Sequence, residues 1–195
     1  KDTKNNTPLH RAETPEKMGA LLDGIDDKNE VVRLLTTKND EEKTALESLD
    51  PKKLEGLLNN LGLSNEQKLT ALKEMSKEDQ EKPEIKDLIE QVLKEQETEN
   101  SKVKQKVADL GVQDPDFGLS PLHHTYGDIA KIKESLKDIP AADQVTLLKI
   151  KDKSGKTPLD YVKKEDLKQL LDDLKLEPKQ QYEVLFNAGE SARRE

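Results

Sequence analysis

Apolar residues along this chain recur at the spacing of one α-helical stripe. Leu54, Leu57, Leu58 and Leu61 stand at positions i, i+3, i+4 and i+7, which lie on one face of an α-helix. Similar stripes begin at four other places, namely Met18, Ile85, Ile132 and Leu167. No segment alternates apolar and polar residues for long enough to predict a β-strand. The pattern therefore predicts an all-α fold.

Prolines and capping residues mark where the predicted helices begin. Pro15, Pro51 and Pro83 stand at or near the first turn of a stripe, where the missing N–H of proline costs no hydrogen bond. A further helix follows each stripe. One of these begins after Ser64, which is three residues before Gln67, the spacing of a capping box. Each stripe therefore predicts a pair of helices.

The second half of the chain repeats the first. Thr7-Pro8-Leu9-His10 recurs as Ser120-Pro121-Leu122-His123, and Thr44-Ala45-Leu46-Glu47 recurs as Thr157-Pro158-Leu159-Asp160. One shift along the chain, called here the long period, takes position 7 to 120 and position 44 to 157. Six of the seven leucines from Leu54 to Leu72 also have a leucine one long period further on. A shorter period separates the stripes at Met18 and Leu54. Such periods predict a helical solenoid, in which each repeat packs only on its neighbours.

The predicted solenoid is a single array of about five repeats. They cover residues 1–40, 41–76, 77–116, 117–153 and 154–195. Polar turn sequences, such as Lys151-Asp152-Lys153-Ser154-Gly155, separate the repeats. The third repeat is degenerate, because a polar segment from Ser76 to Lys82 replaces its Thr-Pro-Leu-His opening. Residues 95–106 are also strongly polar, and we expect a long, mobile connection there.

Composition limits the classes of partner. Hydrophobic residues make up 32% and charged residues 38%, which would suit a disordered chain if the apolar residues were scattered. A solenoid of regularly spaced apolar residues needs fewer of them than a globule does. The net charge of −8, with both signs mixed, disfavours nucleic acid as a partner. The chain has no cysteine and no apolar run of the roughly 18 residues that a membrane span needs, so we expect neither thiol chemistry nor a membrane span.

The openings of the repeats resemble those of ankyrin repeats. In that family the Thr caps the first helix, and the His bonds to the loop backbone and ties adjacent repeats together. The resemblance gives these roles to five residues, namely Thr7, His10, Ser120, His123 and Thr157. Three repeats lack the His, and a further helix is expected where ankyrin repeats carry a hairpin loop. Another helical solenoid of similar period is the alternative.

The resemblance also predicts a binding surface. In an ankyrin array the residues just after Thr-Pro-Leu-His line the concave face. Here these residues are Arg11, Ser48, His124 and Tyr161, with Glu13 and Tyr126 one turn further on. Arg and Tyr are frequent among the residues that dominate binding energy at interfaces. The six residues are therefore the predicted partner-binding residues, and packing between repeats is the alternative role for Tyr161.

The remaining motifs predict no chemistry. The adjacent residues His123 and His124 point in different directions on a helix and make a poor chelate for a metal ion. Acidic pairs such as Asp26-Asp27 stand in polar runs, where the pKa of a carboxyl group is not shifted by burial. There is no glycine-rich phosphate loop. We expect no catalytic residue, no metal, no cofactor and no small-molecule substrate.

The predicted function is protein–protein interaction through a concave repeat surface. The composition also resembles that of ankyrin proteins of intracellular bacteria, which implies an effector that acts on host proteins. The expected location is the cytoplasm, or the host cytosol for such an effector. The alternatives are a structural or targeting segment of a larger multidomain enzyme, and a helical enzyme in its own right. Because the chain starts at Lys1 rather than Met, we expect it to be a piece of a longer protein.

Overall fold

A computed structural model describes residues 2–189, and it is built from helices. This range contains ten α-helices and five short 3-10 helices but no β-strand, which confirms the predicted all-α fold. The chain divides into two compact parts, Lys1–Glu99 and Asn100–Glu195, called here the N-terminal unit and the C-terminal unit. Among the described helices, none combines the length and the apolar character needed to cross a membrane.

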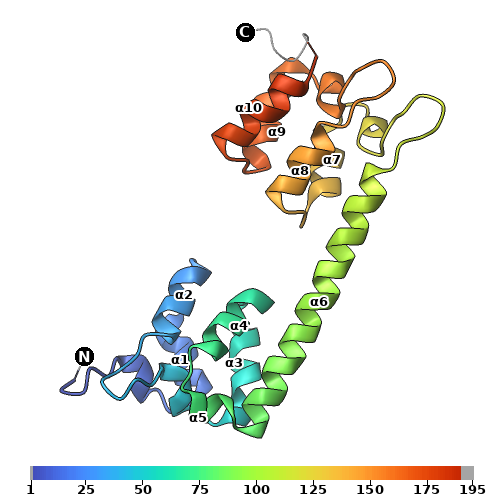
Figure 1. The fold of residues 1–195 in the computed structure, drawn as a ribbon. Helices are drawn as coiled ribbons and strands as arrows, with labels where there is room; N and C mark the ends of the chain where they lie inside the picture. Colours follow the sequence, from blue (N-terminus) through green and yellow to red (C-terminus); the bar gives the residue numbers. More distant parts are fainter. Residues whose placement is uncertain (1, 190–195) are drawn as a thin grey trace. The chain divides into compact units, whose positions relative to one another are not determined.

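The N-terminal unit stacks one pair of helices on another. Its elements are η1 (Pro8–Arg11), α1 (Pro15–Leu22), α2 (Lys28–Leu35), η2 (Ala45–Ser48), η3 (Pro51–Lys53), α3 (Leu54–Asn60), α4 (Asn65–Lys73), α5 (Lys77–Gln80) and the start of α6 (Pro83–Gly111). Helix α1 packs against α3, and α2 packs against α4 (Figure 1). The core contains the apolar stripes predicted from sequence, including the fully buried Met18, Leu54 and Ile85.

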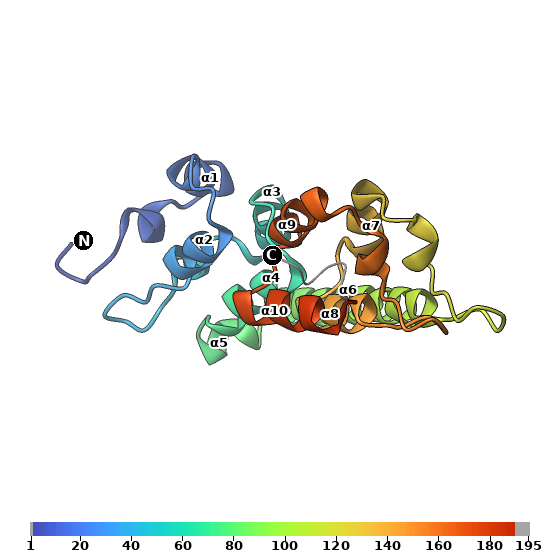
Figure 2. The ribbon, with the colours of Figure 1, turned by 90° about the horizontal axis from the view of Figure 1, so that it is seen from above.

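The C-terminal unit has the same arrangement. After the end of α6 it contains η4 (His123–Thr125), α7 (Ile129–Leu136), α8 (Ala141–Leu148), η5 (Pro158–Tyr161), α9 (Lys164–Asp173) and α10 (Pro178–Asn187). Helix α7 packs against α9, and α8 packs against α10 (Figure 2). Leu148, Leu159 and Leu170 are fully buried, as are their counterparts one long period earlier, except for Leu57, which is 2% exposed.

The second helix of each pair shows that the units are structural copies. Helices α2, α4, α8 and α10, called here the second helices, begin at Lys28, Asn65, Ala141 and Pro178. The starts of α2 and α4 are as far apart in sequence as those of α8 and α10. Each start in the C-terminal unit also lies one long period after its equivalent in the N-terminal unit. The long period in the sequence is therefore a period of the secondary structure.

Three local features differ from the sequence predictions. The Thr-Pro-Leu-His openings form short 3-10 turns, not the first turns of α-helices. In the first repeat the cause is Pro15, because a residue before proline is held in an extended conformation, as Thr14 is (φ −136°, ψ 149°). Residues 36–44 and 149–157 form loops between repeats, so no further helix stands in place of the hairpin loop. The polar stretch 95–106 lies within α6, so the expected connection is helical.

Candidate functional site

Four opening turns share one hydrogen-bond pattern. In each turn the backbone N–H of a Thr or Ser is donated to the side chain three residues further on. The pairs are Thr7 to His10 Nδ1 (3.2 Å), Thr44 to Glu47 Oε1 (3.0 Å), Ser120 to His123 Nδ1 (3.0 Å) and Thr157 to Asp160 Oδ2 (2.8 Å). This bond fixes the acceptor side chain against the turn and leaves its other polar atom directed away from it.

In the two histidine turns, that other atom connects one repeat to the next. His10 Nε2 lies 3.0 Å from the carbonyl oxygen of Lys43, and His123 Nε2 lies 3.1 Å from that of Lys156. Both histidines therefore make the connection that the ankyrin resemblance implied. Asp160 Oδ1 accepts the N–H of Gly189 (2.6 Å), and this bond lies within the last repeat. The carboxylate of Glu47 uses one oxygen for both bonds, since Oε1 also accepts the N–H of Ser76 (3.0 Å).

The sequence predictions missed the hydrogen-bonding role of Glu47 and Asp160. A signal was available, because both acids stand three residues after a Thr, at capping-box spacing. They also occupy the position that His10 and His123 occupy in the other two turns. A carboxylate accepts an N–H where an imidazole donates to a carbonyl, so the two residue types make opposite bonds from one position.

Three predicted binding residues lie in the C-terminal unit, around η4 and η5. Tyr126 is 75% exposed and has a left-handed backbone conformation (φ 51°, ψ 36°). The exposed ring of His124 meets it edge to face, with ring centroids 6.3 Å apart. Tyr161 is half-buried; its ring meets His123 edge to face at 5.9 Å, and its hydroxyl donates to Asp152 Oδ2 (2.8 Å). The contacts of Tyr161 match the packing alternative, whereas Tyr126 faces solvent.

The residue after Tyr126 packs closely against the backbone of η5. This residue, Gly127, has φ 77°, and an added Cβ there would lie 1.9 Å from the carbonyl oxygen of Tyr161. No other residue therefore fits at this position without a backbone shift. Asp152 fixes the neighbouring loop. Burial acts to raise the pKa of Asp152, but hydrogen bonds from Ser154, from the N–H of Lys156 and from the Tyr161 hydroxyl outweigh burial and hold this pKa at about 2.

The other three predicted residues lie in the N-terminal unit. Arg11 is exposed and pairs with the carboxylate of Asp2, and this hydrogen bond is the main cause that lowers the pKa of Asp2 well below its usual range. Glu13 is exposed. Ser48 is half-buried, and its hydroxyl donates to the carbonyl oxygen of Ala45 (2.7 Å) within its own turn. Ser48 is therefore engaged locally, while Arg11 and Glu13 face solvent.

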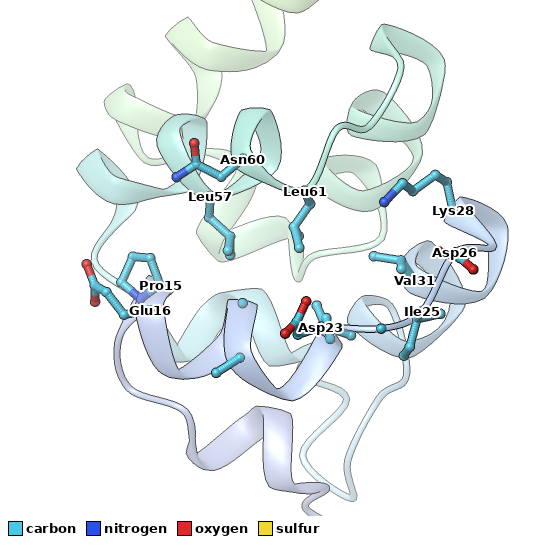
Figure 3. Close-up of a pocket in the computed structure, with 14 residues that line it drawn as sticks. Pro15, Glu16, Asp23, Ile25, Asp26, Lys28, Val31, Leu57, Asn60 and Leu61 are labelled. Atoms are coloured by element: carbon cyan, nitrogen blue, oxygen red, sulfur yellow. The ribbon is translucent and has the colours of Figure 1, made fainter.

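A cleft that the sequence did not predict lies in the N-terminal unit. It has a volume of about 410 Å³ and is bordered by α1, α2, α3 and the loop between α1 and α2. Leu57 of α3 and Leu61, just after α3, line it on one side, and three carboxylates (Glu16, Asp23 and Asp26) and one ammonium group (Lys28) lie around it (Figure 3). The cleft therefore combines apolar surface with negative charge, which suits a basic or amphipathic segment of a partner.

The C-terminal unit has a counterpart of this cleft with different charges. Aligning the first residues of α1 and α7 pairs Gly19 with Lys133 and Asp23 with Lys137, and both lysines line the second cleft. Lys133 forms an ion pair across it with Asp173 (2.7 Å). Sequence reasoning gave no sign of either cleft, because the lining residues come from separate helices and share no motif.

The chain was compared with protein-family models, curated proteins and solved structures, and none of them matches. Within residues 2–189, the His, Asp and Glu side chains form no cluster of three or more that could hold a metal ion. Two features remain as candidate binding sites. One is Tyr126 on its supported turn, and the other is the acidic cleft.

Proposed function

We propose that this chain is a protein-binding module built from ankyrin-like helical repeats, with Tyr126 as a central contact residue. The observation that carries the proposal is that Tyr126 exposes 75% of its surface from a backbone fixed in the left-handed conformation. Tyrosine is enriched among the residues that dominate interface energies. A contact residue fixed before binding loses little conformational entropy when the partner arrives.

The backbone of Tyr126 adds a second argument. A left-handed conformation costs a residue other than glycine roughly 1–2 kcal/mol. Because the Tyr126 ring is exposed in the free protein, its packing does not offset this cost. Strained positions that the surrounding structure holds in place are frequent at binding sites. Gly127 and the Tyr161 carbonyl provide that surrounding structure here.

The ankyrin-like array is proposed on the contacts between successive loops. The N–H of Asp40 donates to the carbonyl oxygen of Lys4 (3.1 Å), and that of Lys153 donates to the carbonyl oxygen of Phe117 (2.9 Å). Both partners of the second bond lie one long period after those of the first, so the same bond occurs in each unit. An ankyrin-like array requires such hydrogen bonds between successive loops and opening turns, recurring at the period of the repeat. The proposed array has about five repeats, two in each unit and a degenerate one formed by α5 and α6.

The test is capture of partners from lysates on the immobilised chain. The Tyr126→Ala variant is expected to retain less than a tenth of a specific partner, because truncation of a central tyrosine at an interface typically costs more than about 1.4 kcal/mol. Phe117→Ala is the matched control, since Phe117 is another exposed aromatic residue of the C-terminal unit, with 69% exposure. Circular dichroism checks that both variants are equally helical. A partner held equally by the native chain and the Tyr126→Ala variant would contradict the assignment to Tyr126.

A further inference from the structure

The acidic cleft and the second cleft occupy equivalent places but differ in their cations. The second cleft is lined by two lysines, Lys133 and Lys137, and by two acids, Glu134 and Asp173, so its charges cancel. Lys133 on α7 bridges this cleft to Asp173, the last residue of α9 (2.7 Å). The chain thereby neutralises the second cleft with lysines of its own.

The acidic cleft has no such bridge. Gly19 of α1 stands at the position of Lys133, and Asn60 lies one long period before Asp173. A Cβ added at Gly19 would meet no atom within 4 Å. The position from which a lysine side chain crosses the second cleft is therefore open space in the acidic cleft.

The acidic cleft also keeps an excess of negative charge. Its three carboxylates, those of Glu16, Asp23 and Asp26, outnumber its one ammonium group, that of Lys28. Within residues 2–189, the carboxylate of neither Asp23 nor Asp26 forms a hydrogen bond or an ion pair. Two negative charges of the cleft are therefore left without a partner from the described part of the chain.

The position of Asp23 is unfavourable for a negative charge in the free protein. Asp23 is the residue that ends α1, where the partly negative carbonyl groups of the last turn collect. The helix dipole repels a carboxylate there, whereas it attracts Lys137 at the end of α7. A cation that enters the acidic cleft would relieve this repulsion, in addition to pairing with the carboxylate.

We infer that the acidic cleft binds a lysine or arginine side chain from a basic segment of a partner protein. The incoming side chain supplies from outside the cation that Lys133 supplies in the second cleft. Its charged end lies at Asp23, and its alkyl part packs on Leu57 and Leu61, which Figure 3 shows pointing toward α1. Long basic side chains bind in this way, with the stem on apolar surface and the charge at a polar group. The site lies in the N-terminal unit and uses none of the residues around Tyr126, so it goes beyond the proposed function.

The site is tested on an array of heptapeptides whose flanking residues are randomised. The central residue is arginine, lysine, citrulline or glutamate, and the array is probed with the fluorescently labelled full chain. Citrulline matches arginine in shape but carries no charge. The chain is expected to bind the arginine and lysine peptides about five- to tenfold more strongly than the citrulline peptides, the upper range for a partly exposed ion pair.

Two variants assign this preference to the acidic cleft. Asp23→Lys introduces the charge that Lys137 carries in the second cleft, and Gly19→Lys introduces the cation that Lys133 supplies there. Either substitution is expected to abolish the preference for basic over citrulline peptides. Asp87→Lys is the matched control for net charge, because Asp87 is exposed on α6 outside the cleft, and it should leave the preference intact. Circular dichroism checks that the variants are equally helical.

Other outcomes overturn the inference. Equal binding of the basic and the citrulline peptides removes the site, and so does a preference that both Asp23→Lys and Gly19→Lys retain. Equal loss in Asp87→Lys would reduce the effect to the net charge of the chain. A dimer seen by light scattering that Asp23→Lys dissociates assigns the cleft to a second copy instead. Tyr126→Ala is expected to keep the preference, so this site and the proposed function at Tyr126 fail or stand separately.

Discussion

One residue in each histidine turn decides how adjacent repeats are joined. Nδ1 of His123 accepts the N–H of Ser120, so the proton of the neutral ring is on Nε2, which donates to the carbonyl oxygen of Lys156. The same reasoning assigns the tautomer of His10. These two histidine contacts were predicted from sequence, because the resemblance to ankyrin repeats implies them. The resemblance also placed Tyr126 on the exposed surface, but it did not predict the left-handed backbone of Tyr126, which stands directly before Gly127.

Loss of the His123 side chain is expected to destabilise the C-terminal unit by about 2–3 kcal/mol, because buried polar groups then lose their partners. His123 is 1% exposed, so water does not replace the imidazole readily. The measurement is urea unfolding of His123→Ala. The adjacent variant His124→Ala is the matched control, and as an exposed site it should change the free energy of unfolding by less than about 0.5 kcal/mol. Equal effects of the two substitutions would refute the role of His123.

Acid is expected to destabilise the loop held by Asp152. The pKa of this carboxyl group is about 2 in the folded chain against an ordinary value of 3.8. The unfolded chain therefore binds the proton first, and the contribution of Asp152 is complete above pH 3.8 and lost as the pH falls towards 2. Thermal unfolding measured across this range should show a smaller pH dependence for Asp152→Asn than for the native chain. An unchanged pH dependence in the variant would be inconsistent with this assignment.

Among the elements, the spacing of apolar residues predicted the helices that bury an apolar face. The stripes at Leu54 and Leu167 lie in helices whose leucines are buried, and α1 buries Met18 and Leu22 of its stripe. The polar part of α6 has no such face, and the helix propensity of its Glu, Lys and Gln residues supports it instead. The 3-10 turns escaped prediction because the ankyrin resemblance implied the first turn of an α-helix at each opening.

Leu88 tests whether α6 belongs to the core of the N-terminal unit. It is 7% exposed, whereas Leu93 on the same helix is 39% exposed. Leu88→Ala is expected to lower the free energy of unfolding by about 2–5 kcal/mol, the range for buried leucines. Leu93→Ala should cost clearly less. Chemical denaturation of the two variants provides the comparison, and equal losses would place α6 outside the core.

For the whole molecule, the duplication was readable from sequence because the buried leucines kept their positions from one copy to the next. The surfaces of the copies have diverged, as the different charges of the two clefts show. The division between the units falls within α6, at Glu99 and Asn100. Its one trace in the sequence is the polar stretch 95–106, which offers a single apolar residue, Val103, for a shared core.

Equivalent core substitutions are expected to act within their own unit. Leu58 and Leu171 occupy equivalent positions in the two units and are 1% and 3% exposed. Leu58→Ala should reduce protection from hydrogen exchange in residues 2–99 alone, and Leu171→Ala in residues 100–189 alone, because each belongs to a separate core. Hydrogen exchange followed by mass spectrometry resolves the two regions. Loss of protection across both regions from either substitution would show that the cores unfold together.

The most direct test of the binding surface is photocross-linking from position 126. A photoreactive phenylalanine analogue replaces Tyr126 in one protein and the exposed Gln169 in another, and both are irradiated in the lysate that yields a partner. A covalent adduct with the partner is expected from position 126 and not from position 169. Equal adducts from both positions, or an adduct from position 169 alone, would contradict the proposal that Tyr126 is central to partner binding.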